Sequence, residues 1–76
     1  MPLDKTAPPA ATRIRLNGAP AETCARTLAE LVAIEGHAEA AVATAVNGDF
    51  VPRQERAATL LSEGDRVEIV APRQGG

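Results

Sequence analysis

Alanine makes up almost half of the apolar residues in this sequence, which leaves few side chains large enough to build a core. Of the 34 apolar residues, 16 are alanine, and Phe50 is the single aromatic residue. A chain of 76 residues with so few large apolar groups can enclose one core but not two. We therefore predict one small domain with a thin core and no large cleft.

Charge and cysteine content argue against several classes of function. The chain carries eight basic and ten acidic residues, and no segment concentrates lysine or arginine as nucleic-acid binding requires. Cys24, the only cysteine, can form neither an internal disulfide nor a cysteine cluster for a metal. We expect it to be a small buried side chain in a strand rather than a nucleophile.

The sequence shows no sign of export or membrane insertion. Its first residues lack the basic-then-apolar order of a secretion signal, and no apolar run approaches the ~20 residues that cross a bilayer. A reducing compartment suits a chain with one cysteine. We expect a cytoplasmic protein that binds no nucleic acid, membrane or metal and is monomeric when free.

The clearest strand in the sequence is Arg66–Val70, which alternates charged and apolar residues at the strand period of two. Val67 and Ile69 share one face, which we predict to be buried. The opposite, solvent-facing side carries Arg66, Glu68 and Val70.

A hairpin is predicted at the start of the domain. Residues 12–17 alternate in the same way, and the pair Asn17-Gly18 follows. Asparagine and glycine both tolerate positive φ, so this pair is a strong signal for a tight turn. The return strand is expected over residues 21–24.

A second hairpin is predicted around Asn47-Gly48. Residues 38–46 are rich in alanine and fit a helix as well as a strand, but the turn signal that follows favours a strand over residues 42–47. The partner strand covers residues 50–51, and Pro52 restricts it to a short or edge position because proline lacks the N–H donor.

One helix is predicted between the two hairpins. Thr27 and Glu30 form a capping box at its start, and Gly36 suits its C-terminal cap. Its apolar stripe consists of Leu28, Leu31 and Val32. Residues 54–61 are expected to form a helical turn or a loop, and residues 62–65 a turn before the last strand.

The resulting order, two strands, a helix and three strands, predicts an α+β domain in which a mixed sheet of four to five strands covers one main helix. We assign residues 12–70 to this domain. Residues 1–11 contain three prolines and few large apolar groups, so a disordered leader is expected there. Residues 71–76 are expected to form a flexible tail.

Ordinary catalytic constellations are missing from the sequence. His37 is the single imidazole, and its place at the end of the predicted helix suits a solvated residue. Glu63 and Asp65 flank a glycine in a predicted turn, where carboxylates are usually solvated. These residues do not predict an enzyme.

The unusual feature is the end of the sequence, Gly75-Gly76. Two residues without Cβ atoms let enclosing walls approach the backbone closely, and they adopt φ values closed to other residues. At ~3.3 Å a residue, residues 71–76 can carry the end roughly 20 Å beyond the domain. Such a tail can enter the narrow active site of a partner, and its reactive group would be the α-carboxylate of Gly76.

Three stretches together resemble the ThiS family, the sulfur carrier proteins of thiamine biosynthesis. They are the turn segment V-N-G-D-F-V-P-R (46–53), the strand segment L-S-E-G-D-R-V-E-I-V (61–70) and the end P-R-Q-G-G (72–76). The Asn17-Gly18 turn and the predicted helix start also suit that family. The resemblance covers residues 12–76, and its motifs are specific in combination.

The resemblance implies a ubiquitin-like β-grasp fold, with a strand rather than a helix over residues 38–46. It also implies that an E1-like adenylyltransferase (ThiF type) uses ATP to activate the carboxylate of Gly76. A sulfur-relay enzyme then yields a thiocarboxylate, 1-thioglycine, and thiazole synthase (ThiG type) takes the sulfur. The carrier would bind no cofactor of its own and catalyse nothing.

Partner recognition on this reading uses the outer face of the last strand, because it borders the segment that must be inserted. The face consists of Arg66, Glu68 and Val70, and the inserted tail of Pro72, Arg73, Gln74 and Gly75 before Gly76. An ordinary solvated strand face has the same composition, so that interpretation stays open.

Two other functions fit the same terminal pattern. The small subunit of molybdopterin synthase has a similar fold and Gly-Gly end, although its tail is normally preceded by bulkier apolar residues than residues 71–74 provide. A ubiquitin-like modifier would instead join its terminal glycine to a lysine.

Overall fold

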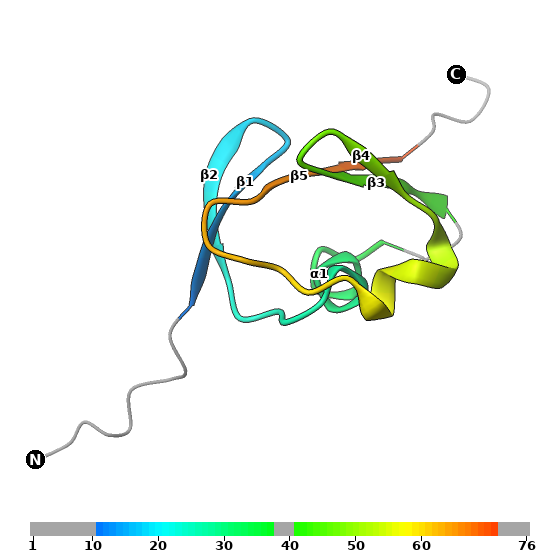
Figure 1. The fold of residues 1–76 in the computed structure, drawn as a ribbon, viewed down its shortest axis with the longest axis horizontal. Helices are drawn as coiled ribbons and strands as arrows, with labels where there is room; N and C mark the ends of the chain where they lie inside the picture. Colours follow the sequence, from blue (N-terminus) through cyan, green and yellow to red (C-terminus); the bar gives the residue numbers. More distant parts are fainter. Residues whose placement is uncertain (1–10, 38–40, 72–76) are drawn as a thin grey trace, which may run out of the picture.

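The computed structural model describes residues 11–37 and 41–71, in which helices cover one face of a five-stranded sheet (Figure 1). The strands are β1 (Thr12–Leu16), β2 (Ala19–Thr23), β3 (Ala43–Val46), β4 (Asp49–Val51) and β5 (Arg66–Val70). The helices are α1 (Leu28–Ile34) and the 3₁₀ helix η3 (Arg53–Ala58). The strand order is β2-β1-β5-β3-β4, so the last strand lies in the middle of the sheet.

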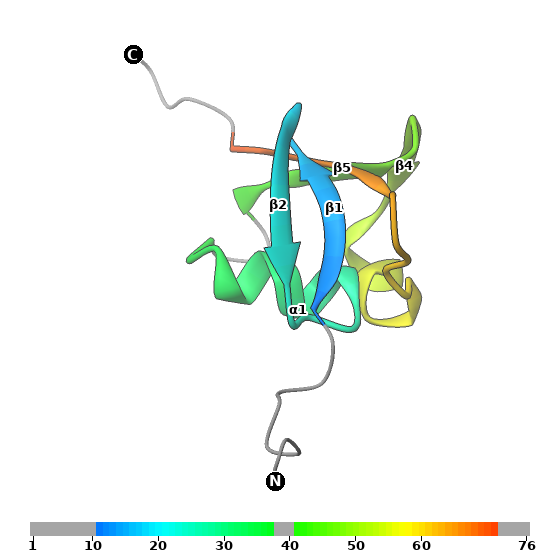
Figure 2. The ribbon, with the colours of Figure 1, turned by 90° about the vertical axis from the view of Figure 1, so that its left-hand side faces the viewer.

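The sheet is mixed, as predicted. β1 and β5 run parallel, whereas the pairs β1–β2, β3–β4 and β3–β5 are antiparallel. The α+β class, the single main helix and the bounds of β5 are confirmed. Figure 2 shows the β1–β2 hairpin in front of β5, with α1 below β5 and behind the lower end of the hairpin.

Both Asn-Gly turns are present. Asn17 and Asn47 each have a φ of 53°, and Gly18 and Gly48 follow with φ of 86° and 88°. Positive φ at both central residues is what a type I′ turn requires, and this turn matches the twist of the two strands that it joins. The second hairpin consists of β3 and β4, so residues 43–46 form a strand.

The predicted return strand at residues 21–24 was wrong in its bounds, since β2 begins at Ala19 and ends at Thr23. The two-residue turn pairs Leu16 directly with Ala19. Pro20 is tolerated in this edge strand. Its partner Arg15 directs its backbone N–H away from β2, to the Asp65 carbonyl, so Arg15 and Pro20 form a pair without hydrogen bonds between them. The N–H donor that proline lacks is therefore not needed at this position.

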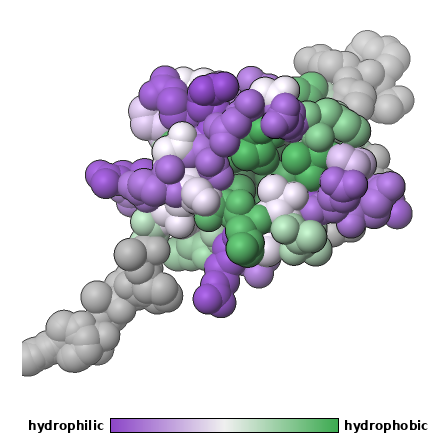
Figure 3. All heavy atoms as spheres, in the orientation of Figure 1, coloured by the Kyte–Doolittle hydropathy of each residue, from purple (hydrophilic) through white to green (hydrophobic). Residues whose placement is uncertain are grey.

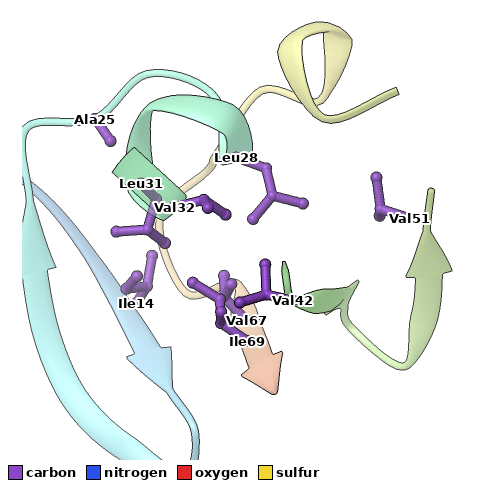
Figure 4. Packing of buried hydrophobic residues seen from close by; sticks show 9 residues of the cluster. All are labelled: Ile14, Ala25, Leu28, Leu31, Val32, Val42, Val51, Val67 and Ile69. Atoms are coloured by element: carbon purple, nitrogen blue, oxygen red, sulfur yellow. The ribbon is translucent and has the colours of Figure 1, made fainter. Parts of the chain in front are cut away.

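The core lies between α1 and the sheet, and the predicted stripe of α1 is fully inside it (Figure 4). Thr27 caps the helix by accepting a hydrogen bond from the Glu30 N–H, and Glu30 accepts one from the Arg26 N–H. Helix and strands meet through a small set of side chains. The buried apolar residues are Ile14, Ala25, Leu28, Leu31, Val32, Val42, Val51, Val67 and Ile69.

A buried arginine fastens η3 to β3, and no sequence pattern indicated it. Arg56 is 2% exposed, and it donates from Nε to Thr44 Oγ1 at 3.0 Å and from Nη2 to the Val42 carbonyl at 2.6 Å. Thr44 Oγ1 in turn donates to the Val51 carbonyl at 2.8 Å. This polar network substitutes for apolar packing that the alanine-rich sequence cannot supply.

We expect Arg56→Met to lower the free energy of unfolding by about 2–3 kcal/mol, because two buried acceptors lose their charged donor. Arg53→Met, at an exposed position of the same helix, is the matched control and should cost less than about 0.5 kcal/mol. Urea denaturation measures both variants. Equal stabilities for the two variants would contradict this role of Arg56.

Candidate functional site

The outer side of β5 has the predicted exposure. Arg66, Glu68 and Val70 are exposed, whereas Val67 and Ile69 are buried. Because β5 is the middle strand and the helices cover the other face, these three side chains lie near the centre of the open face of the sheet.

Phe50 lies on the same open face, and it was not among the predicted site residues. It is 68% exposed on β4, and it pairs with Ala45 of β3, which pairs in turn with Glu68 of β5. Val70 pairs with Ala43. Only alanine side chains of β3 therefore separate Phe50 from the end of β5. The strand period could have found it, because Val51 points inward and its neighbour must point outward.

Apolar side chains are unevenly distributed on the surface. In Figure 3 they gather toward β3, β4 and the end of β5, whereas hydrophilic side chains cover the β1–β2 hairpin. On the open face, Phe50 and Val70 are 68% and 58% exposed, which gives this face an apolar part next to the point where β5 ends.

Both edges of β5 are bound along the strand. On the β3 side, pairing runs from Val67 to Val70. On the β1 side, Arg66 and Val67 pair with Arg15 and Leu16, and the Asn17 N–H reaches the Val67 carbonyl at 2.9 Å.

The side chains of the two turn asparagines bind opposite ends of β5. Asn17 accepts from the Ile69 N–H at 2.9 Å and donates from Nδ2 to the Ile69 carbonyl at 3.2 Å. Asn47 accepts from the Arg66 N–H at 2.9 Å and donates from Nδ2 to Asp65 Oδ1 at 3.0 Å. Each asparagine therefore forms a turn and also binds β5 through its side chain.

The turn that precedes β5 is fastened to the start of β1. Arg13 donates its backbone N–H to Glu63 Oε1 at 3.0 Å and its Nε to Glu63 Oε2 at 2.6 Å. The pKa of Glu63 is held below its ordinary value, mainly by the hydrogen bond from the Arg13 backbone N–H and next by the one from the Arg13 side chain. The hydrogen bond between the two side chains also raises the pKa of Arg13. Asp65 accepts from the Ser62 N–H. These contacts indicate that Glu63 and Asp65 stabilise turns and do not indicate a role in acid–base catalysis.

The expectation for Cys24 was wrong. It is exposed and lies after β2, because the strand ends at Thr23. His37 is half-buried after the helix. Among residues 11–37 and 41–71, no three His, Cys, Asp or Glu side chains lie close enough to hold a metal, and no helix is long and apolar enough to cross a membrane.

A hollow of about 370 Å³ lies on the β1–β2 hairpin. It brings together one cation and one carboxylate, and its walls are otherwise apolar. The lining residues are Arg13, Ile14, Pro20, Ala21 and Glu22. Of the predicted site residues that the structure describes, Arg66, Glu68 and Val70, none lines it.

The predicted tail lies outside the described residues. This holds for Pro72, Arg73, Gln74, Gly75 and Gly76. Ala71, the last described residue, is exposed and directly follows β5. Of the predicted leader, only Ala11 is described, so the division into residues 1–11, 12–70 and 71–76 stays a prediction.

A family model identifies the relatives of this fold. The model of the ThiS family matches residues 13–76. The chain belongs to the ThiS family. The resemblance carried by the turn and strand motifs is therefore confirmed, and the five-stranded mixed sheet over one helix is the β-grasp fold of the ThiS family.

Two solved structures similar to the chain are of the thiamine biosynthesis protein ThiS from Geobacter metallireducens. The crystal structure has a TM-score of 0.69 and 28% identity, with 86% of this chain and 100% of that chain covered. The NMR solution structure has a TM-score of 0.72 and 28% identity, with 86% of this chain and 88% of that chain covered. No curated protein sequence matches the chain.

Proposed function

We propose that this chain is a sulfur carrier for the thiazole of thiamine and that the carboxylate of Gly76 carries the sulfur. The observation that carries the proposal is the match to the ThiS family over residues 13–76, which includes the Gly-Gly end. The similar structures from Geobacter metallireducens are those of a thiamine biosynthesis protein, which agrees with this pathway.

The chemistry begins with a carboxylate, which is a poor electrophile. An E1-like adenylyltransferase joins a carboxylate oxygen of Gly76 to the α-phosphorus of ATP, and pyrophosphate leaves. Sulfide sulfur delivered by a sulfur-relay enzyme attacks the carbonyl carbon, and AMP leaves with its oxygen. The product is the thiocarboxylate, 1-thioglycine, whose sulfur thiazole synthase uses.

The position of β5 supports this role. Because β5 is the middle strand and residues 71–76 follow it directly, the terminal carboxylate is attached to a central strand that is paired on both edges. Six residues reach roughly 20 Å when extended, which is enough to enter an enclosed site. The chain supplies the carboxylate and its partners supply the catalysis.

The open face beside β5 is the proposed docking surface for the adenylyltransferase. Its charged part is Arg66 and Glu68, and its apolar part is Val70 with Phe50, which the alanines of β3 leave accessible. An exposed aromatic residue beside a charged row is a typical composition for a recognition surface.

Deleting Gly76, or adding one residue after it, should abolish thiocarboxylate formation while the domain stays folded. The reacting group must be the α-carboxylate of a glycine at the end of a tail of fixed length. The measurement is the intact mass of the chain after incubation with ATP, an E1-like adenylyltransferase and a sulfur donor. Charging replaces one oxygen by sulfur.

Each possible mass has a distinct meaning in that experiment. A sulfur-for-oxygen gain in the unmodified chain, absent from both altered chains, supports the proposal. An isopeptide adduct with a lysine would indicate a modifier instead, and an unchanged mass would contradict the carrier function.

Charge reversal of Arg66 on the docking surface, together with Arg73 in the tail, should slow adenylation. We expect Arg66→Glu with Arg73→Glu to raise KM for the chain by about tenfold, as two complementary contacts become repulsive. Arg53→Glu, an exposed reversal on η3, is the control and should change KM less than about twofold. Pyrophosphate release measures the rate, and identical kinetics in all three chains would remove this surface from the proposal.

A further inference from the structure

The two edges of β5 end differently. On the β3 side, backbone pairing continues to Val70. On the β1 side, backbone pairing ends when the Asn17 N–H meets the Val67 carbonyl, because the chain then turns into β2. Ile69 would face no strand on that edge.

The side chain of Asn17 fills this position. A primary amide offers a donor and an acceptor in one plane, as a peptide group does. It accepts from the Ile69 N–H at 2.9 Å and donates to the Ile69 carbonyl at 3.2 Å, so both backbone groups are satisfied. Asn17 thus extends the parallel β1–β5 pairing from Val67, where the last backbone bond lies, to Ile69.

We propose that Asn17 is a positioning residue that fixes where the tail leaves the domain. This inference rests on the proposed function. With Asn17 in place, Ile69 is bound on its β1 edge and Val70 pairs with Ala43, so the chain leaves the sheet at Ala71. Without it, one edge of β5 is unbound from Ile69 onward, and the adenylyltransferase must order that segment when it binds.

The fold contains a matched control for this residue. Asn47 has the same φ of 53°, precedes a glycine in the same way and also binds a β5 backbone N–H. It acts at Arg66, at the opposite end of the strand from the tail. A general effect of loosening β5 should appear when either asparagine is replaced, whereas an effect on the tail should appear only when Asn17 is replaced.

The experiment compares Asn17→Gly with Asn47→Gly, because glycine keeps the positive φ and removes only the side-chain bonds. Amide hydrogen exchange should quicken at Ile69 by about tenfold or more in Asn17→Gly alone. KM for adenylation should rise about tenfold in that variant, the effect of ordering roughly one more residue, with kcat unchanged. Asn17→Asp keeps the acceptor for the Ile69 N–H, so its Ile69 exchange rate and its KM should lie between those of Asn47→Gly and Asn17→Gly.

The outcomes separate this inference from the proposed function. If the unaltered chain is charged and the two glycine variants share one KM, Asn17 has no special role and the inference is overturned. Ile69 exchange that is equally fast in both variants overturns it as well. If the unaltered chain cannot be charged, the proposed function fails, while the exchange of Ile69 still decides whether Asn17 holds the end of β5.

Discussion

The structure depends on the binding of β5 along both of its edges. The last strand of the domain lies in the centre of the sheet, parallel to β1 and antiparallel to β3. Val67 and Ile69, on its inner face, pack against α1, so the same strand joins the sheet and the core. Loss of this strand would separate the two hairpins from one another.

The thin core explains why polar contacts contribute so much here. Nine buried apolar residues form the cluster, and one of them is an alanine. Arg56 adds buried hydrogen bonds between η3 and β3, and Arg13 with Glu63 joins β1 to the turn before β5. Because Arg13 and Glu63 are exposed, their pair adds little stability, and the buried bonds of Arg56 matter more.

Local patterns predicted the elements whose cause is local. The alternation in β5, the apolar stripe of α1 and the Asn-Gly turns all depend on residues near each other in the chain, and the structure contains them. The bounds of β2 were wrong because the strand begins at Ala19, directly after the two-residue turn, and Pro20 fits there since its partner Arg15 directs its N–H toward Asp65.

Contacts between distant residues could not be predicted. Asn17 and Ile69 are 52 positions apart, and nothing in an Asn-Gly pair says that its side chain will bind another strand. The buried position of Arg56 has the same origin, since it depends on η3 folding against β3. Membership of the ThiS family, by contrast, was predictable, because short motifs carry it.

The position of β5 links this fold to its proposed role. A carrier must present its end to partners while its domain stays folded, and an end that follows the central strand meets both needs. The exposed row of Arg66, Glu68 and Val70 borders that end, so in the proposed function one strand would serve both recognition and presentation.

The most direct test is amide hydrogen exchange along residues 67–71 of the unaltered chain. The account predicts a sharp step: the Val67 and Ile69 N–H groups exchange only through global unfolding, whereas the Ala71 N–H exchanges almost as fast as in an unfolded peptide. Fast exchange at Ile69, or protection at Ala71 equal to that at Val67, would contradict the claim that a fixed β5 presents the carboxyl end.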